Sequence, residues 1–170
     1  MNISDQSQPI LKDAKTIHAW IHAASADYVT PEDWQNWADQ LIAKLEMPPI
    51  WILELSASKS TTDLISKLQQ ILQENAFPFE RSDSSVIGFL LLAYERENLS
   101  LRALLQRAAE TADGGSVPVN REVIWKLLTR LESGEDKKAI EAQFKDITNS
   151  FRSKALSEWD EIKKWSAIGR

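Results

Sequence analysis

Hydrophobic residues recur along most of this chain at the three- and four-residue intervals that place them on one face of an α-helix. The clearest example follows Thr30, which precedes Pro31, the acids Glu32 and Asp33, and an apolar stripe from Trp34 to residue 45. A threonine N-cap, a proline at the first helical position and acids in the first turn are typical of a helix start. Similar stripes occupy residues 11–26, 61–75, 100–112, 120–133 and 136–167.

Turn-forming and capping residues separate these stripes and set the predicted helix boundaries. Residues expected to begin helices are Thr61 or Thr62, Asp83 or Ser84, Ser100 and Asn120. The expected breaks are Pro48-Pro49, Phe77-Pro78-Phe79, Asp113-Gly114-Gly115 and Gly134. The apolar residues 50–55 fit one or two helical turns or a buried extended piece, and their helical neighbours favour helix. Because glycine (5) and proline (6) are otherwise scarce, the pattern predicts an all-α fold, a compact bundle of about seven or eight helices.

Two of the predicted helices are unusual. The helix over residues 83–93 is apolar nearly all round, which predicts that it is the central helix of the domain. The last helix, residues 136–167, would span about 45 Å at the helical rise per residue, which is longer than a small domain is wide. We therefore expect it to bend around the body, to break near Asn149-Ser150, or to overhang and meet a partner.

Length and composition predict one globular domain over residues 1–170, with residues 1–9 as a flexible N-terminal segment. The chain has no cysteine, which excludes disulfides, thiolate metal sites and cysteine nucleophiles. Its longest apolar run covers nine residues, 86–94, whereas a membrane span needs about 20. The first residues show no secretory pattern. We therefore expect a cytoplasmic protein that does not enter a membrane.

The chain carries little recognisable chemistry. His18 and His22 have the spacing of a helical metal pair, but no third ligand can be named, so we expect them to flank an apolar stripe near the surface. There is no Gly-x-Ser-x-Gly motif, phosphate-binding glycine loop or dinucleotide fingerprint. The sequence thus predicts no catalytic residue, no metal site and no cofactor. An enzyme remains an alternative only if its residues converge in a polar pocket of the fold.

Tryptophan is unusually frequent, with seven residues in the chain. Five fall on apolar stripes and are predicted to lie in the core: Trp20, Trp34, Trp37, Trp125 and Trp159. Trp51, which follows two prolines, and Trp165, near the chain end, are predicted to be the exposed ones. Exposed tryptophan is common among residues that dominate protein–protein binding.

Charge is concentrated around Trp51. The formal net charge is −5, which disfavours nucleic-acid binding. Residues 27–54 hold six acids and one base, Lys44. An acidic surface with aromatic anchors suits a basic protein partner, although a solvated helix face is the alternative. The predicted partner-binding residues are Asp27, Glu32, Asp33, Asp39, Glu46, Trp51 and Glu54.

The same region carries a resemblance. The sequences WADQLI at 37–42 and PPIWILEL at 48–55 resemble segments of small helical bacterial immunity proteins, which accompany toxins of the contact-dependent growth inhibition type. The resemblance implies a non-enzymatic inhibitor that binds a toxin domain, such as a basic nuclease, and occludes its active site. The alternative is a helical adaptor or self-associating scaffold that uses the long last helix. The sequence leaves the oligomeric state open.

Overall fold

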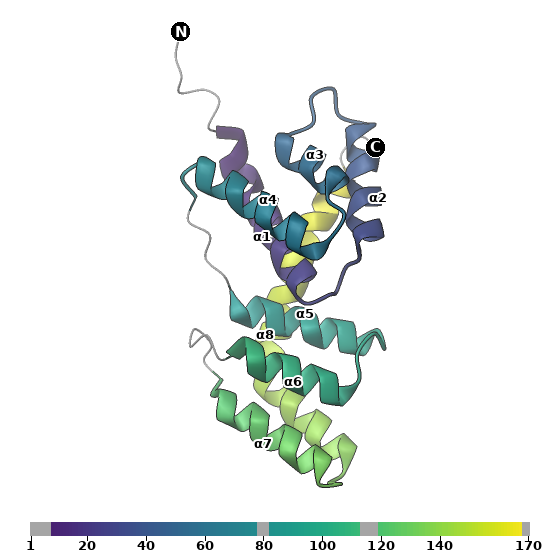
Figure 1. Cartoon of the computed structure of the whole chain (residues 1–170), viewed down its shortest axis with the longest axis vertical. Helices are drawn as coiled ribbons and strands as arrows, with labels where there is room; N and C mark the ends of the chain where they lie inside the picture. Colours follow the sequence, from purple (N-terminus) through teal and green to yellow (C-terminus); the bar gives the residue numbers. More distant parts are fainter. Residues whose placement is uncertain (1–7, 78–81, 113–118, 168–170) are drawn as a thin grey trace. The chain divides into compact units, whose positions relative to one another are not determined.

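The computed structural model describes residues 8–77, 82–112 and 119–167, and these ranges contain eight α-helices and no strand (Figure 1). The all-α prediction is confirmed, and so is the long C-terminal helix. The helices are α1 (Gln8–Ser25), α2 (Pro31–Ile42), α3 (Ile50–Ala57), α4 (Thr61–Glu74), α5 (Asp83–Glu95), α6 (Leu101–Ala112), α7 (Arg121–Glu132) and α8 (Lys137–Ser166). The short apolar segment after the two prolines is thus helical, as predicted.

Side-chain caps begin several of these helices. Thr30 and Asp33 form a reciprocal capping box on α2, in which the Thr30 amide donates to the Asp33 carboxylate at 2.7 Å and the Asp33 amide donates to the Thr30 hydroxyl at 3.3 Å. Asn120 accepts from the Glu122 amide at 2.9 Å and caps α7. Ser100 accepts from an α6 amide at 3.1 Å. These three caps confirm the predicted helix starts.

One predicted start is wrong by one or two residues: Ser60, rather than Thr61 or Thr62, caps α4. α5 begins at Asp83, as predicted, and Ser82 caps it. A capping residue needs an extended backbone. Ser60 has one, with φ −143° and ψ 159°, whereas both threonines already lie inside the helix.

The predicted helix ends and breaks have different outcomes. Gly134, with φ +88°, follows α7 as predicted. The expected breaks at Pro78-Phe79 and at residues 113–115 lie outside the described residues. α8 is continuous across Asn149 and Ser150, which excludes the break there, one of the three alternatives for this helix. Neither residue is a proline, so both keep the backbone N–H that a continuous helix needs. The apolar residues before and after them also continue the helical stripe.

Contacts divide the chain into two compact units. The first unit comprises Met1–Arg81 and Glu158–Arg170, and the second unit comprises Ser82–Ser157. α8 therefore contributes its last nine described helical residues, 158–166, to the first unit. The first unit holds 14 acidic and 9 basic residues, and the second holds 11 of each. The whole net charge of −5 thus belongs to the first unit.

The first unit is built on a continuous series of aromatic rings. Tyr28 contacts Trp159 at 5.0 Å between ring centroids, Trp159 contacts Trp20 at 6.0 Å, and Trp20 contacts Trp37 at 5.0 Å. The series continues from Trp37 to Trp51 at 5.8 Å and from Trp51 to Trp165 at 5.4 Å. Most pairs meet edge to face, the geometry that ring quadrupoles favour. Four helices, α1, α2, α3 and α8, supply the tryptophans.

The predictions that Trp51 and Trp165 are exposed are both wrong. Trp51 is 0% exposed, and its indole N–H donates to the buried Asp13 carboxylate at 2.8 Å. Trp165 is half-buried and donates to the Thr16 hydroxyl at 3.1 Å. Both indoles therefore find polar partners inside the unit, which makes their burial favourable.

The prediction for Trp125 is wrong in the opposite direction. This residue is 36% exposed on α7. Neighbouring residues on a helix lie about 100° apart, and the buried stripe of α7 runs through Ile124, Leu127 and Leu128. Trp125 therefore falls on the flank of this stripe, and Val123, 41% exposed, falls on the other flank.

His22 also departs from its predicted position near the surface. Its ring is buried, and Nδ1 lies 2.9 Å from the Glu158 carboxylate. His18, half-buried, lies within 2.7 Å of the Ala14 carbonyl oxygen through its own Nδ1. His22 thus joins α1 to α8 inside the first unit, whereas His18 bonds within α1.

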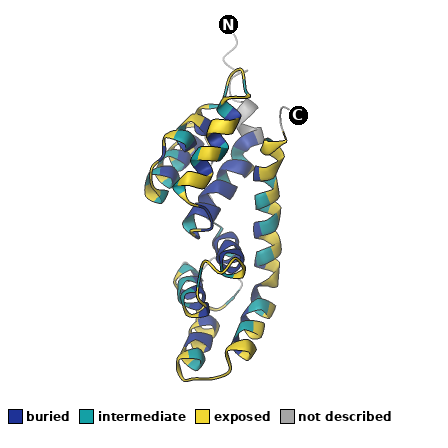
Figure 2. Ribbon diagram, turned by 90° about the vertical axis from the view of Figure 1, so that its right-hand side faces the viewer, coloured by how far each residue is buried: buried dark blue, intermediate teal, exposed yellow. Residues whose placement is uncertain are grey.

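The second unit is organised around α5. Every residue of this helix from Ser85 to Ala93 is buried, as the nearly continuous apolar sequence predicts, whereas most other helices show one buried and one exposed side (Figure 2). Gly88 allows α8 to approach closely. A Cβ added there would lie 2.7 Å from the Phe151 carbonyl carbon and 2.9 Å from the Ala155 Cβ.

Candidate functional site

The outer face of α3 exposes large apolar side chains. Ile50 is 54% exposed and Leu53 is 39% exposed, and their spacing of three residues makes them neighbours on the helix surface. Met47, in the connection that precedes α3, is 87% exposed. Trp51, Ile52 and Leu55 occupy the opposite, buried face. α3 is thus apolar on both faces, and only one of them is covered within the first unit.

One border of this apolar face meets α2. The Ser56 hydroxyl donates to the Asp39 carboxylate at 2.5 Å and joins the two helices at their surface. Glu32 and Asp39 lie two helical turns apart on the exposed side of α2. Glu46 is exposed in the connection that leads to Met47. Asp39 and Glu46 therefore place carboxylates at the α2 border, and Glu32 continues the acidic side of α2 toward the start of that helix.

The other border meets α4. Glu54, four residues after Ile50, lies 3.2 Å from the Lys67 ammonium, which also lies 3.4 Å from Asp63. Desolvation by itself would lower the pKa of Lys67, but hydrogen bonds and charge attraction from Glu54 and Asp63 outweigh it and raise the pKa above its ordinary value. Lys67 therefore stays charged and compensates the acids of this border.

The structure separates the predicted binding residues into three groups. Asp39 and Glu46 are exposed beside the apolar face, and Glu54 borders it in an ion pair. Glu32 is exposed on the same side of α2 as Asp39, two helical turns nearer the start of that helix. Asp33 is exposed but lies on the other flank of α2, where it serves the capping box. Asp27 is exposed between α1 and α2 with φ 51°. Trp51 is buried and lies beneath the surface.

Three side chains of this surface were missed by sequence reasoning: Met47, Ile50 and Leu53. One signal could have found them. A helix of only eight residues that is apolar on nearly all sides must expose one apolar face unless it is buried all round. We call the surface formed by Glu32, Asp39, Glu46, Met47, Ile50 and Leu53 the acidic–apolar face. Its chemistry suits binding to another macromolecule, because an apolar centre with a polar border is the usual organisation of protein interfaces.

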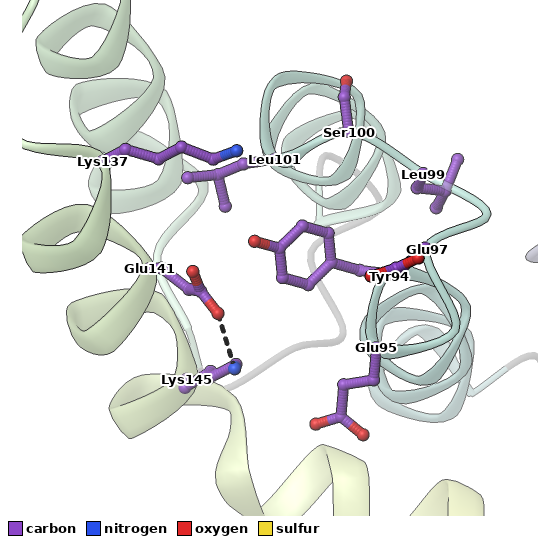
Figure 3. A pocket seen from close by; sticks show the side chains of 9 residues that line it. All are labelled: Tyr94, Glu95, Glu97, Leu99, Ser100, Leu101, Lys137, Glu141 and Lys145. Atoms are coloured by element: carbon purple, nitrogen blue, oxygen red, sulfur yellow. Dashed lines mark hydrogen bonds and ion pairs between the residues drawn. The ribbon is translucent and has the colours of Figure 1, made fainter.

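A second candidate is a hollow of about 430 Å³ in the second unit (Figure 3). The Tyr94 ring projects into it, with the hydroxyl on the side of Glu141. Glu141 lies 2.6 Å from the Lys145 ammonium, and Lys137 and Ser100 also line the hollow. The lining thus presents both signs of charge, a phenol and a hydroxyl.

The protonation states in this hollow do not favour acid–base catalysis near neutral pH. Hydrogen bonding from Lys145 lowers the pKa of Glu141, with Tyr94 and Lys137 contributing. Desolvation raises the pKa of Tyr94, and Glu141 raises it further. Glu141 is therefore a carboxylate and Tyr94 a neutral phenol, and both pKa values are displaced away from the range in which proton transfer is efficient.

Among the residues that the structure describes, no group of three or more histidine, aspartate or glutamate side chains is arranged to hold a metal ion. Within the same residues, no helix is both long enough and apolar enough to cross a membrane. No protein-family model matches the chain, and neither a curated protein nor a solved structure matches it significantly.

Proposed function

We propose that this chain is a non-enzymatic protein-binding protein that binds a basic partner through the acidic–apolar face. The observation that carries the proposal is the exposure of Met47, Ile50 and Leu53 within seven residues of sequence. Clustered exposed apolar side chains mark interaction sites on proteins. Carboxylates at the border accelerate encounter with a positively charged partner.

The specific form we propose is an immunity protein, which neutralises a toxin by covering its active site. Two observations support it: the concentration of the net charge on the first unit, and the location of the immunity-like segments 37–42 and 48–55 in α2 and α3. A nuclease toxin has a basic substrate groove, because it must bind phosphates. An acidic surface with apolar anchors complements such a groove.

The proposal can be tested by site-specific photocrosslinking in cells. A benzophenone amino acid replaces Ile50, and the matched control carries it at Gln73, an exposed position on α4 of the same unit. We expect one predominant crosslinked protein from Ile50 and not from Gln73, and we expect the Ile50→Asp variant to lose the stable 1:1 complex with that protein. Equal crosslinking at both positions, or none at Ile50, would contradict the proposal.

The immunity role has its own readout. We expect the captured partner to arrest growth when it is produced alone. Co-production of the wild-type chain should restore growth, and co-production of Ile50→Asp should not. A captured partner that is harmless in cells would remove the immunity role while leaving protein binding intact.

An adaptor is the second candidate, and Trp125 favours it. This exposed tryptophan lies in the second unit, whereas the acidic–apolar face lies in the first, and an adaptor needs two separate surfaces. The test is Trp125→Ala. Loss of a second binding partner, with binding at the acidic–apolar face unchanged, would support the adaptor role.

A further inference from the structure

The two borders of the apolar face on α3 differ in charge, and this difference constrains the partner. On α3, the exposed residues Ile50, Leu53 and Ala57 form a ridge opposite the buried ones. Ser56 lies on one side of this ridge and Glu54 on the other, because each is offset from it around the helix. Ser56 bonds to Asp39 of α2, and Glu54 pairs with Lys67 of α4. The ridge therefore has an α2 border and an α4 border.

The α2 border is acidic. Besides Asp33 in its capping box, α2 and the connection after it expose three carboxylates, Glu32, Asp39 and Glu46, and one lysine, Lys44; Asp39 and Glu46 lie nearest the ridge. α2 itself contains no basic residue. Glu32 and Glu46 form no ion pair with any described residue, so their charges are directed to solvent. This border attracts cations.

The α4 border is neutral. The two acids Glu54 and Asp63 are balanced in charge by Lys59 and Lys67. The Lys67 ammonium lies within 3.4 Å of both carboxylates. Lys67 stays charged, as its ion pairs require. A cationic group that approached this border would meet compensated acids and a fixed ammonium, so it would gain little attraction.

From this asymmetry we infer that the partner presents an apolar centre with lysine or arginine side chains along one side only, the side that meets α2. The inference rests on the proposed function and adds the orientation of the complex. The ridge supplies contact area, the α2 border fixes the direction in which the partner lies, and Lys67 disfavours partners that are basic on both sides.

A carbodiimide crosslinking experiment tests this orientation, because the reagent joins carboxylates to lysine amines that are in direct contact. The full chain is mixed with the partner captured through Ile50, and crosslinked peptides are identified by mass spectrometry. We expect links from Glu32, Asp39 or Glu46 to partner lysines and none from Glu54 or Asp63. Links from both borders, or from the α4 border alone, would overturn the inference. Links to lysines of a second copy of this chain would overturn it as well.

Binding kinetics provide an independent measurement. We expect the double variant Glu32→Lys/Glu46→Lys to lower the association rate constant at low salt by about tenfold or more. The single reversals Glu32→Lys and Glu46→Lys are measured beside the double variant, and Glu74→Lys, at an exposed position at the end of α4, is their control because it makes the same change of +2 in net charge. The Lys67→Gln variant should change the affinity less than threefold, because the partner has no cation to place at this border.

The failures of the two proposals are distinguishable. If no partner is captured at Ile50, the proposed function is wrong and the orientation falls with it. Suppose instead that a partner is captured. If Lys67→Gln then changes the affinity by threefold or more, or if Glu32→Lys and Glu46→Lys slow association no more than Glu74→Lys does, only the orientation is wrong.

Discussion

Replacing Trp51 tests whether this residue belongs to the fold or to a binding surface. Its side chain is fully buried, contacts the rings of Trp37 and Trp165, and donates a hydrogen bond of 2.8 Å to Asp13. In Trp51→Phe, an aromatic ring remains on Cβ and the indole N–H is removed. The variant therefore separates loss of the hydrogen bond from loss of the whole aromatic side chain.

The expected cost has two parts. The buried Asp13 carboxyl loses a donor, and an unmet hydrogen bond at a buried acceptor costs about 1–3 kcal/mol. Phenylalanine is smaller than tryptophan by three heavy atoms, or about 40 Å³ of packed volume, which at about 24 cal/mol per Å³ of cavity adds about 1 kcal/mol. We therefore expect the free energy of unfolding to fall by about 2–4 kcal/mol.

Urea denaturation followed by circular dichroism measures this change, and a double-mutant cycle with Asp13→Leu isolates the hydrogen bond. If the bond is made as described, the double variant should be more stable than the sum of the two single changes predicts, by about 1–2 kcal/mol. In the absence of urea, where Trp51→Phe should remain folded, its affinity for the partner should be unchanged. A variant that keeps its stability but loses partner binding would refute the reasoning, because Trp51 would then act at the surface.

Three further predictions concern packing, pH and the role of α8. Gly88→Ala should destabilise the second unit by about 1–3 kcal/mol in urea denaturation, because the new methyl group meets the backbone of Phe151; a gain in stability, the usual result for glycine to alanine in a helix, would contradict the close approach. The pKa of Glu141 is lower in the folded chain than its ordinary value of 4.5, so the stability that its ionised form contributes is complete above pH 4.5 and is lost as the pH falls below it. The Glu141→Gln variant should therefore lose less stability than the wild type between about pH 5 and pH 3. Parallel curves of unfolding free energy against pH would argue against this contribution. Truncation after Ser157 should unfold the first unit, because it removes α8 residues of the aromatic series, and near-ultraviolet circular dichroism would detect the loss of the tryptophan environment; an unchanged spectrum would show that α8 is dispensable there.

Helix content was predictable because it depends on local signals. The period of the apolar stripes, the cap at Thr30 and the caps at Ser100 and Asn120 all act within a few residues of sequence. Where neighbouring residues could serve equally well, as at Ser60 and Thr61, the choice depended on backbone angles that the sequence does not display.

The acidic–apolar face was predictable only in part. Charge is visible in the sequence, and the acids Glu32, Asp39 and Glu46 are exposed in the structure. Exposure of apolar residues is not visible, and Trp51 was therefore assigned to the surface in place of Ile50 and Leu53. A difference of one residue on a helix changes the direction of a side chain by about 100°, which is enough to exchange core and solvent.

The sequence by itself determined an all-α chain with a long last helix, an acidic N-terminal half and tryptophans in need of burial. Only the tertiary structure decided which face of α3 is covered, because that depends on Asp13, some forty residues earlier in the chain, meeting the Trp51 indole. It also decided that Lys67 compensates Glu54. Local sequence sets the period and the charge of each helix, whereas contacts between distant segments set which side of it meets solvent.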